Sequence, residues 1–161
     1  MSVRRIDQGM AAAAAGLLPP RVSRELRTRY RQLRIMTHTA GLAATYAFIA
    51  AKAGERNDLA DAYRRAGEGI TERLIGLGLL SGEAKRMTAR DVLDQLGTMD
   101  AVEYARASTE TAAFTGWLAR LADAMYQADS PASDRRDGEA SSAGGRDAEP
   151  DGHQAPEQSA W

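Results

Sequence analysis

Apolar residues recur every three or four positions through most of the first 126 residues, which is the period of an α-helix. The strongest pattern spans residues 103–126, where five large apolar residues share one face: Phe114, Trp117, Leu118, Leu121 and Met125. Such a face must be buried against other helices. We therefore predict that residues 103–126 form a core helix and that Trp117 is part of the core.

Five further segments carry helical signals, and almost nothing in the chain has the alternating pattern of a β-strand. Each segment is bounded by a proline, a glycine or a capping residue, and they cover residues 3–17, 21–38, 42–53, 58–77 and 88–97. Thr88, with Asp91 three residues later, predicts a capping box, whereas Gly76 and Gly78 predict fraying at the end of the fourth helix. The pattern predicts an all-α fold, a compact bundle of five or six helices.

Charge and composition divide the chain near residue 128. Residues 1–128 hold 18 basic and 14 acidic residues, a net charge of +4, whereas residues 129–161 hold 3 basic and 8 acidic residues, a net charge of −5. The second segment is rich in Ser, Gly and Pro and has one aromatic residue, so it cannot offset the roughly 1 to 2 kcal/mol per residue that ordering its backbone costs. We predict an α-helical domain over residues 1–128 and a disordered acidic tail over residues 129–161.

Residues suited to catalysis or metal binding are few. The chain has no cysteine for a disulfide or a thiolate site, and His38 is the one histidine of the predicted domain. The carboxylates of the predicted helices lie close to arginines, an ordinary ion-pair pattern, and the sequence has no motif of a nucleotide-binding loop, a serine hydrolase or a zinc protease. We predict a protein that is not an enzyme and binds no cofactor or metal. No stretch reaches the roughly 18 to 20 apolar residues of a membrane span, and we expect a cytoplasmic location.

The most unusual surface is predicted on the second helix. Residues 21–34 contain six arginines and one glutamate. Four of the arginines lie within an arc of about 80° on the helix, away from its apolar face, and we call them the arginine ridge: Arg24, Arg27, Arg31 and Arg34. Neighbouring like charges repel, so a polyanion such as a phosphate backbone would stabilise the ridge. Alternatively, some of these arginines pair with acidic residues of other helices.

Three segments resemble a known family. The last helix carries the most specific match, which consists of Arg106, Thr109-Glu110, Ala113-Phe114, Trp117-Leu118 and Arg120-Leu121-Ala122. A second match consists of Gly41-Leu42, Ala47-Phe48 and Lys52, and a third of Asp7-Gln8 before an alanine-rich stretch. In this order they resemble the small subunit, the fifth component of the RAMP module, of the type III-B CRISPR RNA-guided effector complex. The resemblance covers roughly residues 3–126 and departs from the family at Ala40 and Ala43, where Asn and Gly are usual.

The resemblance implies a non-catalytic structural subunit of a ribonucleoprotein that acts in antiviral defence. Small subunits of this family stack along the backbone subunits as a minor filament with copies of themselves, and they line the channel where the target RNA pairs with the guide RNA. We therefore predict that the chain contacts RNA phosphates through Arg24, Arg27, Arg31, Arg34 and Lys52. An alternative is a helical protein-interaction or regulatory module without RNA binding, and a hydrolase with a carboxylate site is a third, less favoured class.

Overall fold

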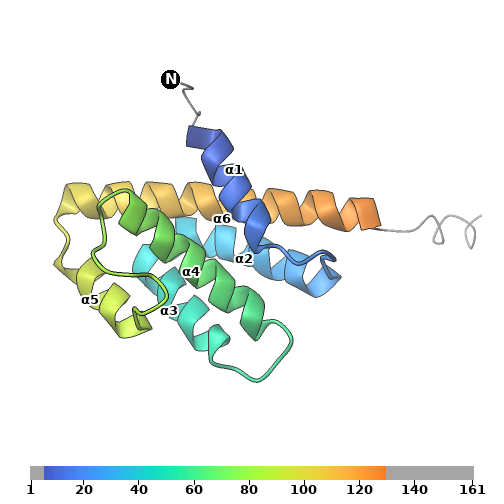
Figure 1. The fold of residues 1–161 in the computed structure, drawn as a ribbon, viewed down its shortest axis with the longest axis horizontal. Coiled ribbons are helices and arrows are strands. Elements are labelled where there is room, and N and C mark those ends of the chain that lie inside the picture. Colours follow the sequence, from blue (N-terminus) through green and yellow to red (C-terminus); the bar gives the residue numbers. More distant parts are fainter. Residues whose placement is uncertain (1–5, 130–161) are drawn as a thin grey trace, which may run out of the picture. The chain divides into compact units, whose positions relative to one another are not determined.

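The computed structural model describes residues 6–129, which form six α-helices and no β-strand (Figure 1). The helices are α1 Ile6–Leu17, α2 Arg24–Thr39, α3 Leu42–Ala53, α4 Ala60–Gly76, α5 Ala89–Thr98 and α6 Ala101–Asp129. The prediction of an all-α bundle is therefore confirmed. The boundary at residue 128 and the disordered tail stay predictions, because residues 130–161 lie outside the described part, and so do residues 3–5 of the first predicted helix.

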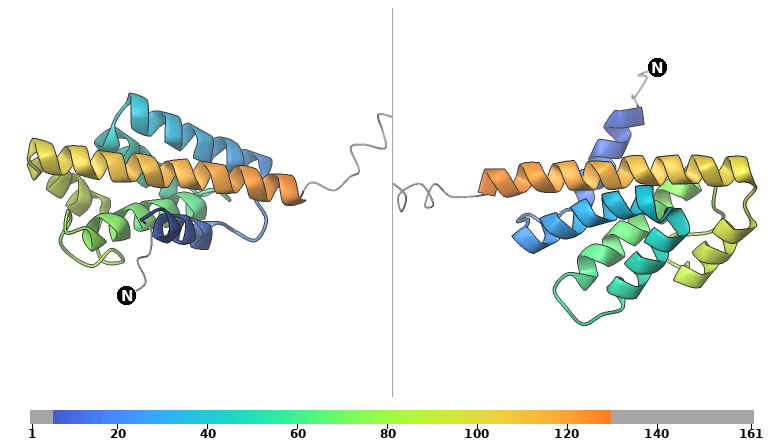
Figure 2. Two further views of the ribbon diagram at one scale, coloured as in Figure 1. Left: turned by 90° about the horizontal axis from the view of Figure 1, so that it is seen from above. Right: turned by 180° about the vertical axis from the view of Figure 1, so that it is seen from behind.

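Helix α6 is the axis of the described domain. Its 29 residues make a rod of about 43 Å at 1.5 Å per residue, and it contacts α1, α2, α3 and α4. Figure 2 shows α2 on one side of α6 and α1 on the other. Helices α2 and α6 run antiparallel, since Arg27 lies against Tyr126 while Thr37 lies against Thr115 further back along α6.

Small residues dominate the buried face of α6. Besides Phe114 and Leu118, the side chains that this helix buries are those of Ala107, Thr111, Thr115, Ala119 and Ala122. The hydroxyls of Thr37 and Thr115 come within 3.4 Å of each other, so α2 and α6 pack closely. Each of these threonines also donates a hydrogen bond to a carbonyl of its own helix, which satisfies the hydroxyl inside the core.

The predicted apolar face of α6 is only partly confirmed. Phe114 and Leu118 are fully buried, but Trp117, Leu121 and Met125 are half-buried and pack against the edge of the core. The prediction weighted the large side chains, whereas the contact with α2 needs small ones. The buried face is therefore rotated toward the alanines and threonines, and Trp117 lies at its edge.

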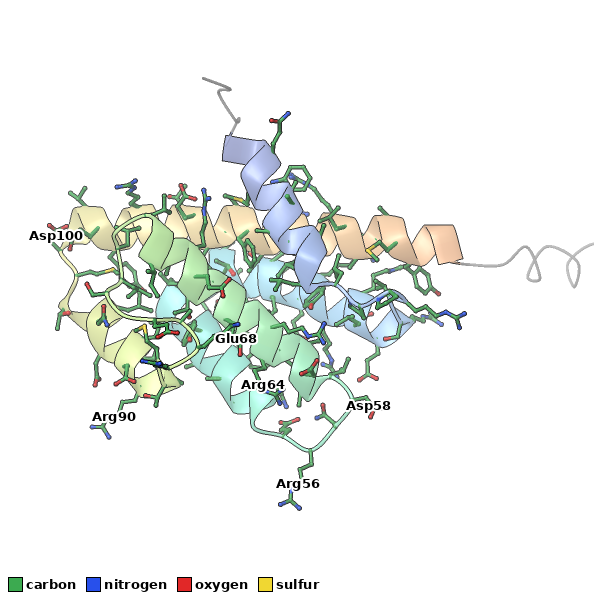
Figure 3. All side chains as sticks on the ribbon, viewed as in Figure 1. Arg56, Asp58, Arg64, Glu68, Arg90 and Asp100 are labelled. Carbon is green, nitrogen blue, oxygen red and sulfur yellow. The ribbon has the colours of Figure 1, made fainter. Side chains whose placement is uncertain are left out.

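Local capping residues begin three of the helices. Thr88 and Asp91 form the predicted capping box at α5, which continues through Gly97 to Thr98 instead of ending at Gly97. Ser23 caps α2 through a 3.1 Å hydrogen bond from the amide of Leu26. Asp100, labelled in Figure 3, caps α6, because its carboxylate accepts bonds of 2.8 Å from two amides of the first turn. These bonds satisfy amides that a helix start leaves unpaired.

Helix α4 ends in a defined turn, so the prediction of fraying is wrong. Gly78 has a φ of +71°, its amide donates to the carbonyl of Ile75 at 2.9 Å, and the amide of Leu79 donates to the carbonyl of Leu74 at 2.9 Å. This pair of bonds is a Schellman motif, which needs a left-handed residue and therefore favours glycine. Gly76 lies two residues earlier with ordinary helical geometry.

Replacing each of these two glycines with alanine is expected to change stability in opposite directions. Gly78→Ala should lower the free energy of unfolding by about 1 to 2 kcal/mol, because a Cβ atom disfavours the left-handed conformation. Gly76→Ala should raise it by up to about 1 kcal/mol through helix propensity, since a Cβ atom there would meet no neighbour within 4 Å. Urea denaturation of both variants measures the two changes in the free energy of unfolding. Equal changes would contradict the Schellman motif.

Candidate nucleic-acid interface

The arginine ridge lies on the solvent side of α2. The buried face of this helix, roughly 120° away around its axis, places Leu26, Tyr30, Leu33 and Thr37 in the core. Arg24, Arg31 and Arg34 are exposed, whereas Arg27 is half-buried. Because α6 packs antiparallel beside α2, part of the ridge faces side chains of α6.

Asp123 of α6 pairs with two of the four ridge arginines. Arg31 donates a hydrogen bond from Nε to Oδ2 of Asp123 at 3.2 Å, and its Nη2 lies 2.8 Å from Oδ1. Arg27 places its Nε 3.4 Å from the same Oδ1, and its guanidinium carbon lies 4.4 Å from the centroid of the Tyr126 ring. Arg27 is therefore held between α2 and α6, while the more exposed Arg31 has one side open to solvent.

A groove runs between α2 and α6 beyond this ion pair. It has a volume of about 520 Å³, and its lining residues are Arg34, Thr37, His38, Ser108, Thr109, Ala112, Ala113, Gly116 and Arg120. We call it the α2–α6 groove. From Ser108 to Arg120 it follows α6 for about 18 Å at 1.5 Å per residue, which is long enough for a few nucleotides of an extended strand.

The charge of the α2–α6 groove is positive. Arg34 from α2 and Arg120 from α6 both line it, and neither forms an ion pair with another residue of the described part of the chain. No acidic residue contributes to the lining. Gly116 leaves the floor open, since a Cβ atom there would have no neighbour within 4 Å. Guanidinium and hydroxyl donors around an open channel suit phosphate oxygens.

Lys52 is placed elsewhere. It lies in the last turn of α3, where its Nζ pairs with Glu55 at 2.5 Å and lies 5.9 Å from the centroid of the Phe48 ring. The hollow beside it is shared with Arg29 and Glu25, on another face of α2 from the ridge. The structure therefore does not bring Lys52 together with the arginine ridge.

Sequence reasoning did not assign Arg120 or His38 to a binding surface. Arg120 and Arg34 are 86 positions apart in the chain and share a groove because α6 lies antiparallel to α2. One signal was present in the sequence: Arg106, Ala113 and Arg120 recur at intervals of seven, which places two arginines on one face of α6. Which helix lies beside that face depends on tertiary packing, so the spacing alone does not pair Arg120 with Arg34.

Several carboxylates of the described helices are engaged in ion pairs or helix caps. Asp61 pairs with Arg64 and Arg65, and Asp91 caps α5. Figure 3 shows Asp58, Glu68 and Asp100 on separate parts of the domain. Among the residues that the structure describes, no three His, Cys, Asp or Glu side chains cluster as metal ligands. The described helices include none with the length and apolar character to cross a membrane.

Comparison with known proteins assigns the family. No curated protein and no solved structure matches the chain significantly. A family model described as CRISPR-associated protein (Cas_Cmr5) matches residues 7–125. The match covers the six helices almost from end to end, and it confirms the resemblance seen in the three sequence segments. The chain therefore belongs to the Cas_Cmr5 family, the small and generally non-catalytic structural subunit of the type III-B CRISPR effector complex.

Proposed function

We propose that this chain is a non-catalytic structural subunit that contacts the phosphates of the guide and target RNA through the α2–α6 groove. Its protein partners are the backbone and neighbouring subunits of the effector complex and further copies of the chain, which stack as a minor filament. Family membership supports the place in the complex, since the matched family is its small subunit. The groove supports the contact with RNA.

The observation that carries this proposal is the pair Arg34 and Arg120. Two guanidinium groups from different helices line one groove without a carboxylate among the lining residues. Arg27 and Arg31 differ, because Asp123 already neutralises part of their charge. We therefore assign the first contacts with phosphate to Arg34 and Arg120, and a supporting role to Arg24, which is exposed at the start of α2.

Such contacts are independent of sequence. Arginine contacts with a phosphate backbone position a strand but read no bases, and in RNA-guided complexes the guide supplies the sequence recognition by base pairing. A small subunit that tolerates any target therefore needs cationic donors and an open channel. The two arginines and the bare Gly116 floor provide both.

A second function has one observation in its favour. Ile35 is 62% exposed on α2, one turn after Arg31 and at the edge of the arginine ridge. An apolar side chain contributes little to phosphate binding, but next to arginines it suits a protein partner with an apolar centre and an acidic rim. A purely protein-binding role for the ridge is the competing outcome of the test below.

The test replaces Arg34 and Arg120 with glutamine in the assembled complex. Gln has a helix propensity similar to that of Arg, so the helices should form normally. The log-log slope of target-RNA association against salt should become shallower by about 0.7 for each single-strand phosphate that the variant no longer binds, or about 1.4 for the pair. The loss of affinity should be similar for unrelated target sequences.

A matched control removes two arginines outside the groove. Arg86 and Arg90 have side chains 83% and 88% exposed, and Figure 3 shows Arg90 projecting away from α5. Arg86→Gln with Arg90→Gln makes the same change in net charge and should leave the salt slope nearly unchanged. If both double variants give the same slope, the groove has no special contact with RNA. If the groove variant fails to enter the complex, the α2–α6 groove is a protein interface.

An uncharged side chain placed in the groove tests whether the shape of the groove matters independently of its charge. Gly116→Leu keeps every charge and favours the helix, but it places a side chain on the floor of the groove. RNA association should weaken as it does for the arginine variant, with the thermal midpoint of the isolated protein maintained or raised. Unchanged association would show that RNA does not enter the groove.

A further inference from the structure

Trp117 and Arg120 form an aromatic and cationic surface at the rim of the α2–α6 groove. The indole is half-buried, with its inner part against the core. The guanidinium carbon of Arg120 lies over the indole, 5.5 Å from the ring centroid. Arg120 also lines the groove, whereas Trp117 is not among the lining residues and reaches the groove only through its contact with Arg120. Arg120 therefore connects the indole with the proposed path of phosphates.

We propose that Trp117 and Arg120 form a stacking platform for one unpaired nucleobase of an RNA strand whose phosphates lie in the α2–α6 groove. This inference rests on the proposed function and deepens it by naming the state of the ligand. A base inside a duplex has both faces covered by its neighbours, so the platform selects a single-stranded or flipped-out nucleotide.

The chemistry of the two side chains suits this role. An indole offers a flat apolar face, and base stacking on such a face tolerates every base. A guanidinium group donates hydrogen bonds in its own plane and stacks through its faces. Because Arg120 lies over the half-buried indole, it can contact a phosphate through the N–H groups at its edge and present its own outer face to a base, with the indole supporting it from behind. A lysine at this position would keep the charge and lose the flat surface.

The positions along α6 are also consistent with a nucleotide. Gly116, Trp117 and Arg120 lie within about 6 Å along the helix axis, which is comparable to the distance between a phosphate and its own base. The small side chain of Ala113, one turn before Trp117, adds little bulk on that side of the surface. A strand in the groove can therefore turn one base outward onto the platform.

The experiment uses the fluorescence of Trp117 in the full chain. The sequence has two tryptophans, Trp117 and Trp161, so Trp161→Phe leaves Trp117 as the one reporter. The protein is titrated at low salt with a dye-labelled single-stranded oligoribonucleotide and with an abasic oligonucleotide of the same length. Dye anisotropy measures binding of each, and Trp117 emission measures stacking.

Both oligonucleotides should bind, but only the one with bases should quench Trp117 emission. Trp117→Leu, which keeps an apolar side chain against the core, should weaken binding of the oligonucleotide with bases about tenfold and leave binding of the abasic one unchanged. Arg120→Lys should keep the salt slope and weaken only the oligonucleotide with bases.

Two results would overturn the platform. Binding of the oligonucleotide with bases without any change in Trp117 emission would show that no base stacks there. Equal weakening of both oligonucleotides by Trp117→Leu would show that Trp117 acts through the shape of the groove. Failure of both oligonucleotides to bind the unmodified chain would overturn the proposed function and the platform together, whereas binding of both with equal quenching overturns the platform alone.

Discussion

Replacing Phe114 with alanine is expected to lower the free energy of unfolding by about 3 to 5 kcal/mol. The side chain is 1% exposed in the middle of α6. It packs closely against Gly69 of α4, because a Cβ atom at Gly69 would come within 2.9 Å of the Phe114 ring and 2.5 Å of Leu17. The loss is large because Gly69 has no side chain that could move into the cavity.

Trp117→Ala is the matched comparison on the same helix. Trp117 is the larger aromatic residue, but it is half-buried at the edge of the core, so its truncation should cost about half as much as that of Phe114. Chemical denaturation of the two variants, monitored by circular dichroism, measures both values. A cost for Trp117 equal to or above that for Phe114 would mean that Trp117 is a core residue after all, as the apolar pattern had predicted.

The contrast between Phe114 and Trp117 shows what the sequence could predict. Helix positions and caps depend on neighbours within four residues, so the six helices and the Thr88 capping box could be predicted from local patterns. Which face of α6 is buried depends on which helices pack against it. Thr111 and Thr115 gave no apolar signal, yet both are buried, and Thr115 lies directly against Thr37 of α2.

The candidate site could also be predicted only in part, because local patterns place a residue on a helix face but do not identify its partner on another helix. The exposed side of α2 follows from its own period, so the arginine ridge could be placed on the surface. The partner of each arginine could not be predicted, since Asp123 lies 92 positions from Arg31 and Arg120 lies 86 positions from Arg34. The alternative that some ridge arginines pair with acidic residues of other helices holds for Arg27 and Arg31. It does not hold for Arg34 among the described residues.

Asp123 pairs with both Arg27 and Arg31, so under the proposed function its carboxylate would compete with RNA phosphates for these two arginines. We expect Asp123→Asn to tighten association of the assembled complex with target RNA and to steepen the salt slope by about 0.7 for one further bound phosphate. Arg31 should bind this phosphate, because its side chain is 51% exposed while that of Arg27 is 24% exposed. The same substitution should lower the free energy of unfolding by about 1 kcal/mol or less, since the ion pairs that it removes are partly solvated.

The control for this prediction is Asp94→Asn, which makes the same change in net charge at a side chain 73% exposed and 3.7 Å from Arg90. It should leave the salt slope and the stability nearly unchanged. Association is measured for both variants between low and physiological salt, and unfolding is measured on the isolated chain. If the two variants tighten RNA association equally, the increase in affinity is due to net charge alone. Arg31 would then bind no phosphate when Asp123 releases it, and the proposed RNA path would be limited to Arg34 and Arg120 in the α2–α6 groove.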